Sequence, residues 1–126
     1  MARILVIDDS LSAVEKARKV LEGAGHQVET LELLIYLPQA VKTDPPDLIL
    51  LDLSMPALSG VNVAKFIRRY EQKPIPIVLY SSRSTEELVE TAKSLEAAGF
   101  VQKDEPDNVL LSTISKVLSS GRSTRG

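Results

Sequence analysis

The chain of 126 residues carries 15 Lys and Arg against 17 Asp and Glu, which gives a formal net charge of −2. This is the length of one domain, and 44 % hydrophobic with 25 % charged residues is typical of a globular protein, not of a disordered or collagen-like one. Domains that bind nucleic acid are usually distinctly basic, so the charge argues against that class. The chain has no Cys, and His26 is its single histidine, which excludes disulfides, thiolate zinc sites and sites built from several histidines.

No apolar run approaches the ~18 residues that a membrane-spanning helix needs. The first apolar stretch is short and ends in two aspartates, unlike the longer apolar region of a secretory signal. We therefore expect a single-domain protein of the cytoplasm without a membrane partner. The small and polar residues near the C-terminus predict one domain over residues 1–120 and a flexible tail over residues 121–126.

Short runs of β-branched and other apolar residues predict five strands. The clearest run is Arg3–Ile7, which suits a strand that is buried on both faces, as in a parallel sheet. Leu48–Leu51 and Ile75–Tyr80 repeat this type after segments that contain proline. Val28–Leu31 and Phe100–Gln102 are weaker runs and complete the predicted set.

Between these runs the apolar residues recur with the period of a helix. The predicted stripes are Ala13, Ala17, Val20 and Ala24; Val63, Ile67 and Tyr70; Leu88, Ala92 and Leu95; and Leu110, Ile114 and Val117. Glycines are expected to end these helices, Gly23 and Gly25 the first and Gly99 the third. The spacing of Ser84 and Glu87 predicts a capping box. The candidates for the N-cap of the first helix are Asp9, Ser10 and Ser12.

A second, shorter helix is expected between the second and third strands. Leu33–Leu37 is apolar and is followed by Pro38, a residue that suits the first turn of a helix. We therefore predict a loop and then a short helix that begins near Pro38. The apolar cluster has two interpretations: it covers the edge of the sheet, or it forms an exposed docking patch.

The alternation of strands and helices predicts an α/β fold. We expect a doubly wound five-stranded parallel sheet with helices on both faces, joined by right-handed crossovers. In such a sheet, ligands bind outside the carboxyl ends of the strands, where the strand order reverses. The flavodoxin-like order 2-1-3-4-5 of a (βα)5 fold would place the first and third strands side by side.

Polar residues end the predicted strands. Asp8 and Asp9 end the first strand, Asp52 the third, Ser81 the fourth and Lys103 the fifth. Crowded carboxylates repel one another, and a hard cation such as Mg²⁺ removes that penalty. A carboxylate also acts as a nucleophile, and a lysine and a hydroxyl would bind the oxygens of the resulting aspartyl phosphate. The set therefore has the parts for phosphoryl transfer onto an aspartate. The sequence has no G-x-x-x-x-G-K-[ST] loop, which argues against ATP as the direct donor.

Motifs in a fixed order carry a resemblance to a known family. They read Ile-Leu-Val-Ile-Asp8-Asp9, Pro-Asp-Leu-Ile-Leu-Leu-Asp52-Leu-Ser-Met-Pro56 with Gly60, Ile-Pro-Ile-Val-Leu-Tyr-Ser81-Ser82, and Ala-Ala-Gly-Phe100-Val-Gln-Lys103. Over residues 2–120 the chain resembles the receiver domain of bacterial two-component response regulators, in particular the single-domain regulators of chemotaxis.

This resemblance assigns roles to the residues at the strand ends. It implies that Asp52 is the phosphoacceptor and that Lys103 binds the phosphoryl group. It also implies a Mg²⁺ site formed by the side chains of Asp8, Asp9 and Asp52 and completed by the backbone carbonyl of Ser54.

The resemblance also implies a conformational switch and partners. Ser81 corresponds to the switch hydroxyl and Phe100 to the aromatic switch residue, for which a fixed core aromatic is the alternative. A receiver takes its phosphoryl group from a sensor histidine kinase or a phosphotransfer protein. It then binds a downstream protein through the face of the fourth helix (84–97), the fifth strand and the fifth helix (106–118). No nucleic-acid partner is implied, and no enzyme activity beyond self-phosphorylation and self-dephosphorylation.

Three features depart from the family pattern. Asp104 follows Lys103 where the family usually has a cis-proline, and because a non-proline cis bond costs ~2.5–4 kcal/mol, we expect a trans bond. The apolar segment Leu33–Pro38 replaces a polar segment that contains glycine. Arg83 stands two residues after the switch hydroxyl and, with Ser54, is expected to border the path of the attacking water and to set the phosphate lifetime.

The leading hypothesis is a stand-alone receiver, because too few residues follow the predicted fifth helix to form a DNA-binding module. Two alternatives are a phosphate shuttle or sink in a phosphorelay and a degenerate receiver that binds partners without phosphorylation. A phosphatase of the haloacid dehalogenase type would need an aspartate where Ser54 stands. A flavin electron carrier would need a loop rich in Ser, Thr and Gly where Asp8 and Asp9 stand.

Overall fold

The computed structural model describes residues 2–8, 10–31, 37–42, 45–52 and 60–125. Strands and helices alternate along these residues. In chain order they are β1 (Arg3–Ile7), α1 (Leu11–Gly23), β2 (Gln27–Thr30), α2 (Leu37–Lys42), β3 (Leu48–Leu51), α3 (Gly60–Tyr70), β4 (Ile77–Ser81), α4 (Thr85–Leu95), β5 (Gly99–Gln102) and α5 (Asp107–Arg125). No helix within these ranges is both long and apolar enough to cross a membrane.

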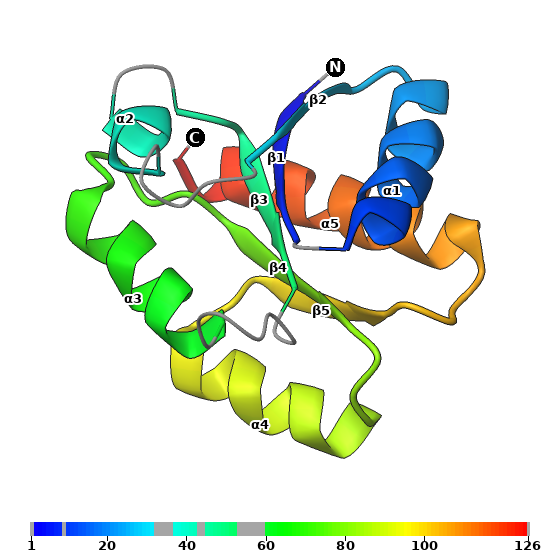
Figure 1. Ribbon diagram of the computed structural model, residues 1–126. Helices are drawn as coiled ribbons and strands as arrows, with labels where there is room; N and C mark the ends of the chain where they lie inside the picture. The colour runs from blue at the N-terminus through cyan, green and yellow to red at the C-terminus, as the bar shows by residue number, and fades with distance from the viewer. Residues whose placement is uncertain (1, 9, 32–36, 43–44, 53–59, 126) are drawn as a thin grey trace.

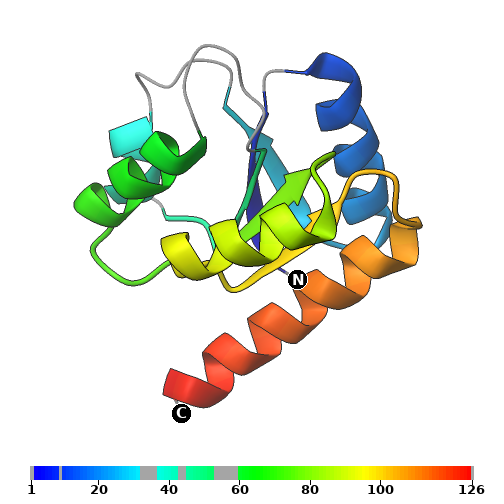
Figure 2. The same cartoon turned by 90° about the horizontal axis from the view of Figure 1, so that it is seen from below.

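The five strands form one parallel sheet in the order β2-β1-β3-β4-β5. Helices α1 and α5 cover one face, and α2, α3 and α4 cover the other (Figures 1 and 2). Successive residues of a strand point to opposite faces, so each inner strand contributes to both cores. In β3, for example, Ile49 and Leu51 pack beneath α2, α3 and α4, whereas Leu48 and Leu50 pack beneath α1 and α5. The predicted fold class and strand order are confirmed.

Strands β1 and β3 have the predicted limits, and the other three strands begin or end one or two residues away from them. The largest difference is in β4, which begins at Ile77 and not at Ile75. Pro76 has no backbone N–H to donate to a neighbouring strand, and its carbonyl still accepts a hydrogen bond from Ile49 N at 2.9 Å. The proline therefore moves the start of the strand without breaking its contact with β3.

The buried face of α1 differs from the predicted stripe. Val14, Ala17 and Leu21 are buried. By contrast, Ala13 and Val20 are half-buried, and Ala24 is exposed. The 3–4 spacing of the observed set places its two larger side chains in the core. Of the three candidate N-caps, the one that the structure shows is Ser10, whose hydroxyl accepts a hydrogen bond from Ala13 N at 3.4 Å.

The third stripe and its N-terminal cap are confirmed, but its predicted end is wrong. Ser84 caps α4 and accepts a hydrogen bond from Glu87 N at 3.3 Å. The helix ends before Glu96, which adopts a left-handed conformation with φ 54°. Gly99 does not end the helix but opens β5, where an added Cβ atom would lie 3.4 Å from Thr113 Cγ2 on α5. That distance is an ordinary van der Waals contact, so packing against α5 does not by itself require glycine at this position.

Helices α2 and α5 also differ from expectation at one end. Helix α2 begins at Leu37, one residue before the predicted start, and Leu37 and Val41 are buried. The apolar residues 33–36 lie outside the described residues, so both interpretations of that cluster stay predictions. Helix α5 continues to Arg125, past the predicted end at residue 118, because each added helical residue gains a backbone hydrogen bond and no proline follows. The flexibility of residues 121–126 stays a prediction.

Burial predicts very different stability effects for two leucines. Leu50 in the central strand β3 is 1 % exposed, whereas Leu11 at the start of α1 is 74 % exposed. We expect Leu50→Ala to lower the free energy of unfolding by about 2–5 kcal/mol, because it leaves a cavity in the core. The control Leu11→Ala should change it by less than about 0.5 kcal/mol. Urea denaturation of both variants measures these values, and equal losses would contradict this assignment of the core.

Candidate functional site

The carboxyl ends of the strands bring together the described residues that the sequence singled out. Asp8 follows β1, Asp52 follows β3, Ser81 ends β4, and Lys103 follows β5. Strands β1 and β3 are neighbours, and Asp52 N continues their ladder by donating to Ile7 O at 3.0 Å. Asp8, Asp52 and Ser81 are all buried. The fold therefore holds two buried carboxylates together at the carboxyl ends of the strands.

The ammonium of Lys103 lies between these carboxylates. Its Nζ atom is 2.9 Å from Asp8 Oδ2 and 3.5 Å from Asp52 Oδ1. Lys103 N also donates to Ser81 O at 2.9 Å, which extends the pairing of β4 and β5 to the base of the lysine side chain. An ammonium in this position compensates part of the negative charge that the sheet buries.

The carboxylate of Asp8 suits a metal ion. Ser10 N donates to Asp8 Oδ1 at 2.9 Å, whereas the buried Oδ2 atom accepts no hydrogen bond from the described residues and has an ionic contact with Lys103. Hard cations such as Mg²⁺ prefer carboxylate oxygens of this kind. Asp9 and Ser54, the other predicted ligands, lie outside the described residues. Within the described ranges no group of three or more acidic or histidine side chains is placed to hold a metal.

Ser81 is tied to the loop that follows β4. Its hydroxyl accepts a hydrogen bond from Arg83 N at 3.2 Å. The side-chain amide of Gln102, on β5, binds the same loop at two points: its Nε2 donates to Arg83 O at 2.9 Å, and its Oε1 accepts from Thr85 Oγ1 at 3.2 Å. Sequence reasoning missed Gln102. Its signal was a polar residue inside an otherwise apolar strand, directly before the predicted phosphate-binding lysine.

Phe100 lies on β5 opposite Leu79 of β4 and is half-buried against the core beneath α2, α3 and α4. This location is compatible with both interpretations of its ring, as a fixed core aromatic and as a switch residue. The switch role of Phe100 therefore stays a prediction.

The peptide bond between Lys103 and Asp104 is trans, as predicted from the absence of proline. Lys16 Nζ, from α1, donates a hydrogen bond to the carbonyl oxygen of Lys103 at 3.4 Å. Lys103 thus reaches Asp8 and Asp52 from an ordinary backbone, with a cation of a neighbouring helix beside its carbonyl group.

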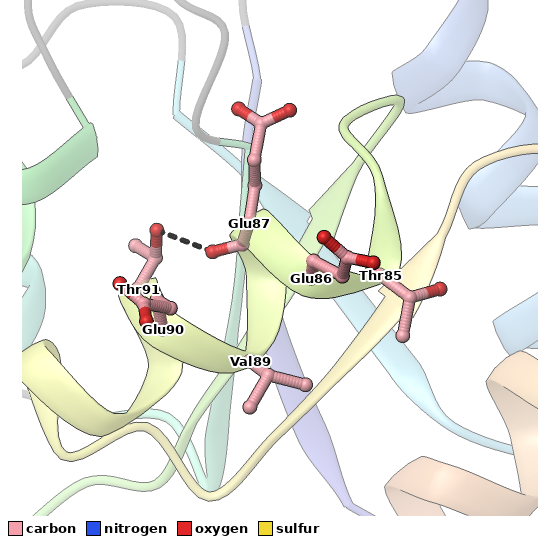
Figure 3. Close-up of a pocket in the computed structure, with 6 residues that line it drawn as sticks. All are labelled: Thr85, Glu86, Glu87, Val89, Glu90 and Thr91. Atoms are coloured by element: carbon pink, nitrogen blue, oxygen red, sulfur yellow. Dashed lines mark hydrogen bonds between the residues drawn. The ribbon is translucent and has the colours of Figure 1, made fainter.

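The outer face of α4 carries a hollow that is separate from this cluster. It has a volume of about 660 Å³ and is lined by Thr85, Glu86, Glu87, Val89, Glu90 and Thr91 (Figure 3). Thr91 Oγ1 donates to the backbone carbonyl of Glu87 at 2.8 Å within this stretch. Among the described residues, those that line the hollow include none of the predicted phosphate site, and they belong to the helix that the sequence assigned to partner binding.

Comparison with known proteins identifies the family. Residues 4–115 match the family model described as the response regulator receiver domain. The chain belongs to this family. The match confirms the resemblance seen in the sequence and replaces the phosphatase and flavin-carrier alternatives.

Individual proteins resemble the chain over most of its length. Protein PilH of Pseudomonas aeruginosa is 31 % identical over 120 residues, which cover 94 % of this chain and 99 % of PilH. Chemotaxis protein CheV2 of Helicobacter pylori is 33 % identical over 105 residues, and the chain spans only 34 % of it. The structure of chemotaxis protein CheY4 of Vibrio cholerae matches with a TM-score of 0.81 at 28 % identity. The match covers 93 % of this chain and 98 % of CheY4.

Receiver domains generally use Mg²⁺ for phosphorylation, and the buried carboxylate of Asp8, whose Oδ2 atom has the ionic contact with Lys103, fits this requirement. We predict that Mg²⁺ raises the thermal unfolding midpoint of the wild type, because a ligand that binds the folded state stabilises it. Asp8→Asn should remove most of this rise. In the control Asp47→Asn the rise should persist, because Asp47 lies at the amino ends of the strands, where it accepts a hydrogen bond from Arg3 N.

Thermal melts at several Mg²⁺ concentrations test this prediction. Equal Mg²⁺-dependent shifts in the wild type and Asp8→Asn would contradict a metal-binding role for Asp8. Asp9→Ala, measured in the same series, asks whether the second aspartate of the motif is a ligand or only a helix cap.

Proposed function

We propose that this chain is a stand-alone receiver that accepts a phosphoryl group on Asp52 from a sensor histidine kinase or a phosphotransfer protein. The observation that carries the proposal is the ammonium of Lys103 within 3.5 Å of the buried carboxylates of Asp8 and Asp52. A buried, charge-compensated aspartate is suited to nucleophilic attack, and the lysine is available for the negative charge that arrives with the phosphoryl group.

In the proposed reaction an oxygen of Asp52 attacks the phosphorus of a phosphohistidine. The new P–O bond forms as the P–N bond breaks, and the leaving imidazole takes up a proton from solvent. Lys103 and the hydroxyl of Ser81 then bind phosphoryl oxygens. Asp8 and Asp9, with Asp52 and the Ser54 carbonyl, would hold Mg²⁺, which supplies positive charge to the transferred group when bound.

The proposal assigns signalling to protein binding and not to catalysis on other molecules. The match covers 99 % of PilH, and this likeness in extent supports the proposal of a stand-alone receiver. The downstream protein would bind the face of α4, β5 and α5, without a nucleic-acid or membrane partner. Histidine kinases meet receivers in the cytoplasm, which is therefore the proposed location.

Two alternatives use the same residues differently. A phosphate shuttle or sink would need Asp52 and Lys103 but no change at α4, whereas a degenerate receiver would need neither. The contacts of Arg83 N with Ser81 Oγ and of Arg83 O with Gln102 give the phosphate site a direct link to the start of α4. This link favours the switching receiver.

Phosphorylation should require the Asp52 carboxylate. We predict that wild-type protein with acetyl phosphate and Mg²⁺ gains the mass of one phosphoryl group, and that Asp52→Asn gains none, because its amide is not a nucleophile. The control Asp104→Asn removes an exposed carboxylate beside the lysine and should still be phosphorylated. Intact-mass spectrometry gives the result, and labelling of Asp52→Asn at the wild-type rate would rule out this acceptor.

The switch should carry the signal from Ser81 to α4. We predict that beryllofluoride, which stands in for the phosphoryl group, shifts the NMR signals of Phe100 and α4 in the presence of Mg²⁺. A few kcal/mol of differential interaction is enough to shift such an equilibrium substantially. Ser81→Ala should bind beryllofluoride but show smaller shifts in α4. Shifts confined to the surroundings of Asp8 and Asp52 in the wild type would favour the phosphate shuttle.

A further inference from the structure

We propose that Tyr80 is a positioning residue for Lys103, and that its aromatic ring holds the lysine ammonium beside the carboxylates of Asp8 and Asp52. The proposal rests on the proposed function in one respect, because the proposed function is what makes Lys103 a ligand of the phosphoryl group. The contact between the ring and the ammonium stands on the structure of the site.

The strand order creates the need for such a support. Lys103 follows β5, at the edge of the sheet, whereas Asp52 and Asp8 follow β3 and β1. Strand β4 lies between them, so the lysine side chain must pass the carboxyl end of β4 to reach the carboxylates. The last two residues of that strand are Tyr80 and Ser81, paired with Val101 and Gln102 of β5. Tyr80 is therefore next to the path of the side chain.

The distance fits a cation–π contact. Lys103 Nζ lies 5.7 Å from the centroid of the Tyr80 ring, within the ~6 Å over which a ring attracts a cation. Tyr80 is 5 % exposed, and the lysine side chain is 21 % exposed. Water therefore screens the contact little, and such a contact is stronger than one at the surface.

The ring is fixed independently of the ligands that Lys103 would bind. Tyr80 belongs to the core beneath α1 and α5, together with Val14 and Leu110. Burial raises the pKa of its phenol above the ordinary value of 10.0, and the carboxylates of Asp107 and Asp8 raise it further. The phenol is therefore neutral at physiological pH and places no negative charge in the core.

This arrangement gives the ring a role during phosphorylation. Lys103 has to exchange a carboxylate partner for a phosphoryl oxygen, so its oxygen contacts change. The contact of the ammonium with the Tyr80 ring can persist while its oxygen partners change. It restricts the ammonium to the region beside Asp52 and lowers the cost of ordering a long, flexible side chain when the phosphoryl group arrives.

The first test measures the position of Lys103 without any phosphorylation. Protons near an aromatic ring have displaced NMR signals, so the ε-methylene protons of Lys103 should be displaced from their ordinary shift in the wild type. Tyr80→Phe should keep the displacement, because it keeps the ring, and Tyr80→Leu should lose it. An undisplaced signal in the wild type, or a displaced one in Tyr80→Leu, would overturn the proposal.

The second test separates the ring's charge distribution from its packing. Phenylalanines with increasing numbers of fluorine atoms at position 80 withdraw electrons from the ring face and weaken cation binding. We expect the phosphorylation rate with acetyl phosphate to fall progressively, by roughly two- to tenfold over the series, while the thermal midpoint changes little. A rate that is independent of fluorination, or that falls only as the thermal midpoint falls, would identify Tyr80 as a core residue alone.

Tyr70 provides a matched control. Tyr70 is the last residue of α3. Lys42 Nζ lies 5.4 Å and Arg69 Cζ 6.0 Å from the centroid of its ring. The same fluorinated series at position 70 should leave the phosphorylation rate unchanged. If the wild type takes up no phosphoryl group at all, the proposed function fails, and the Lys103 signals still decide whether Tyr80 positions the lysine.

Discussion

The arrangement of the site depends on one electrostatic constraint, the burial of two carboxylates at the ends of adjacent parallel strands. Strands β1 and β3 pair from Ile4 and Leu48 to Ile7 and Leu51, and this pairing places the buried residues Asp8 and Asp52 side by side. Two buried like charges are costly unless a cation lies close to both. The ammonium of Lys103 meets that need from the far side of β4, and this explains why a residue of the edge strand β5 reaches across the sheet.

The same ammonium makes the site responsive. A metal ion and Lys103 would both be attracted to Asp8, and a phosphoryl group and Asp52 would both attract Lys103. In the proposed reaction, phosphorylation would therefore redistribute charge among groups that already touch. The proposed change would reach the loop before α4 through Ser81, whose carbonyl oxygen accepts from Lys103 N and whose hydroxyl oxygen accepts from Arg83 N. Gln102 stabilises the observed arrangement of this loop from β5.

Much of this architecture could be predicted from sequence, for identifiable reasons. The apolar runs of β1 and β3 contain no proline or glycine, and their limits were predicted correctly, whereas Pro76 moved the start of β4. The stripe of α1 was only partly correct because several alanines and valines lie on neighbouring faces, and only packing shows that Val14 and Leu21 join Ala17 in the core. The sequence places Tyr80 in a predicted strand but does not show which side chain passes over it. That contact depends on strand order and on a long side chain crossing a strand.

The last two residues of β4 support the proposed phosphate site from opposite faces of the sheet, because successive side chains of a strand alternate between the faces. Tyr80 points to the side of α1 and α5, and Ser81, its neighbour in sequence, points to the opposite side, toward α4. One residue thus supplies an aromatic surface for the lysine, and the next supplies a hydroxyl linked to the loop that leads into α4. A slip of β4 by one residue would exchange the two side chains and separate the lysine from its support. The pairing of Leu51 with Leu79 and of Ser81 with Gln102 holds that register from both neighbouring strands. The hydrophobic core therefore contributes to the proposed chemistry directly, because it fixes which face of β4 each of these residues occupies.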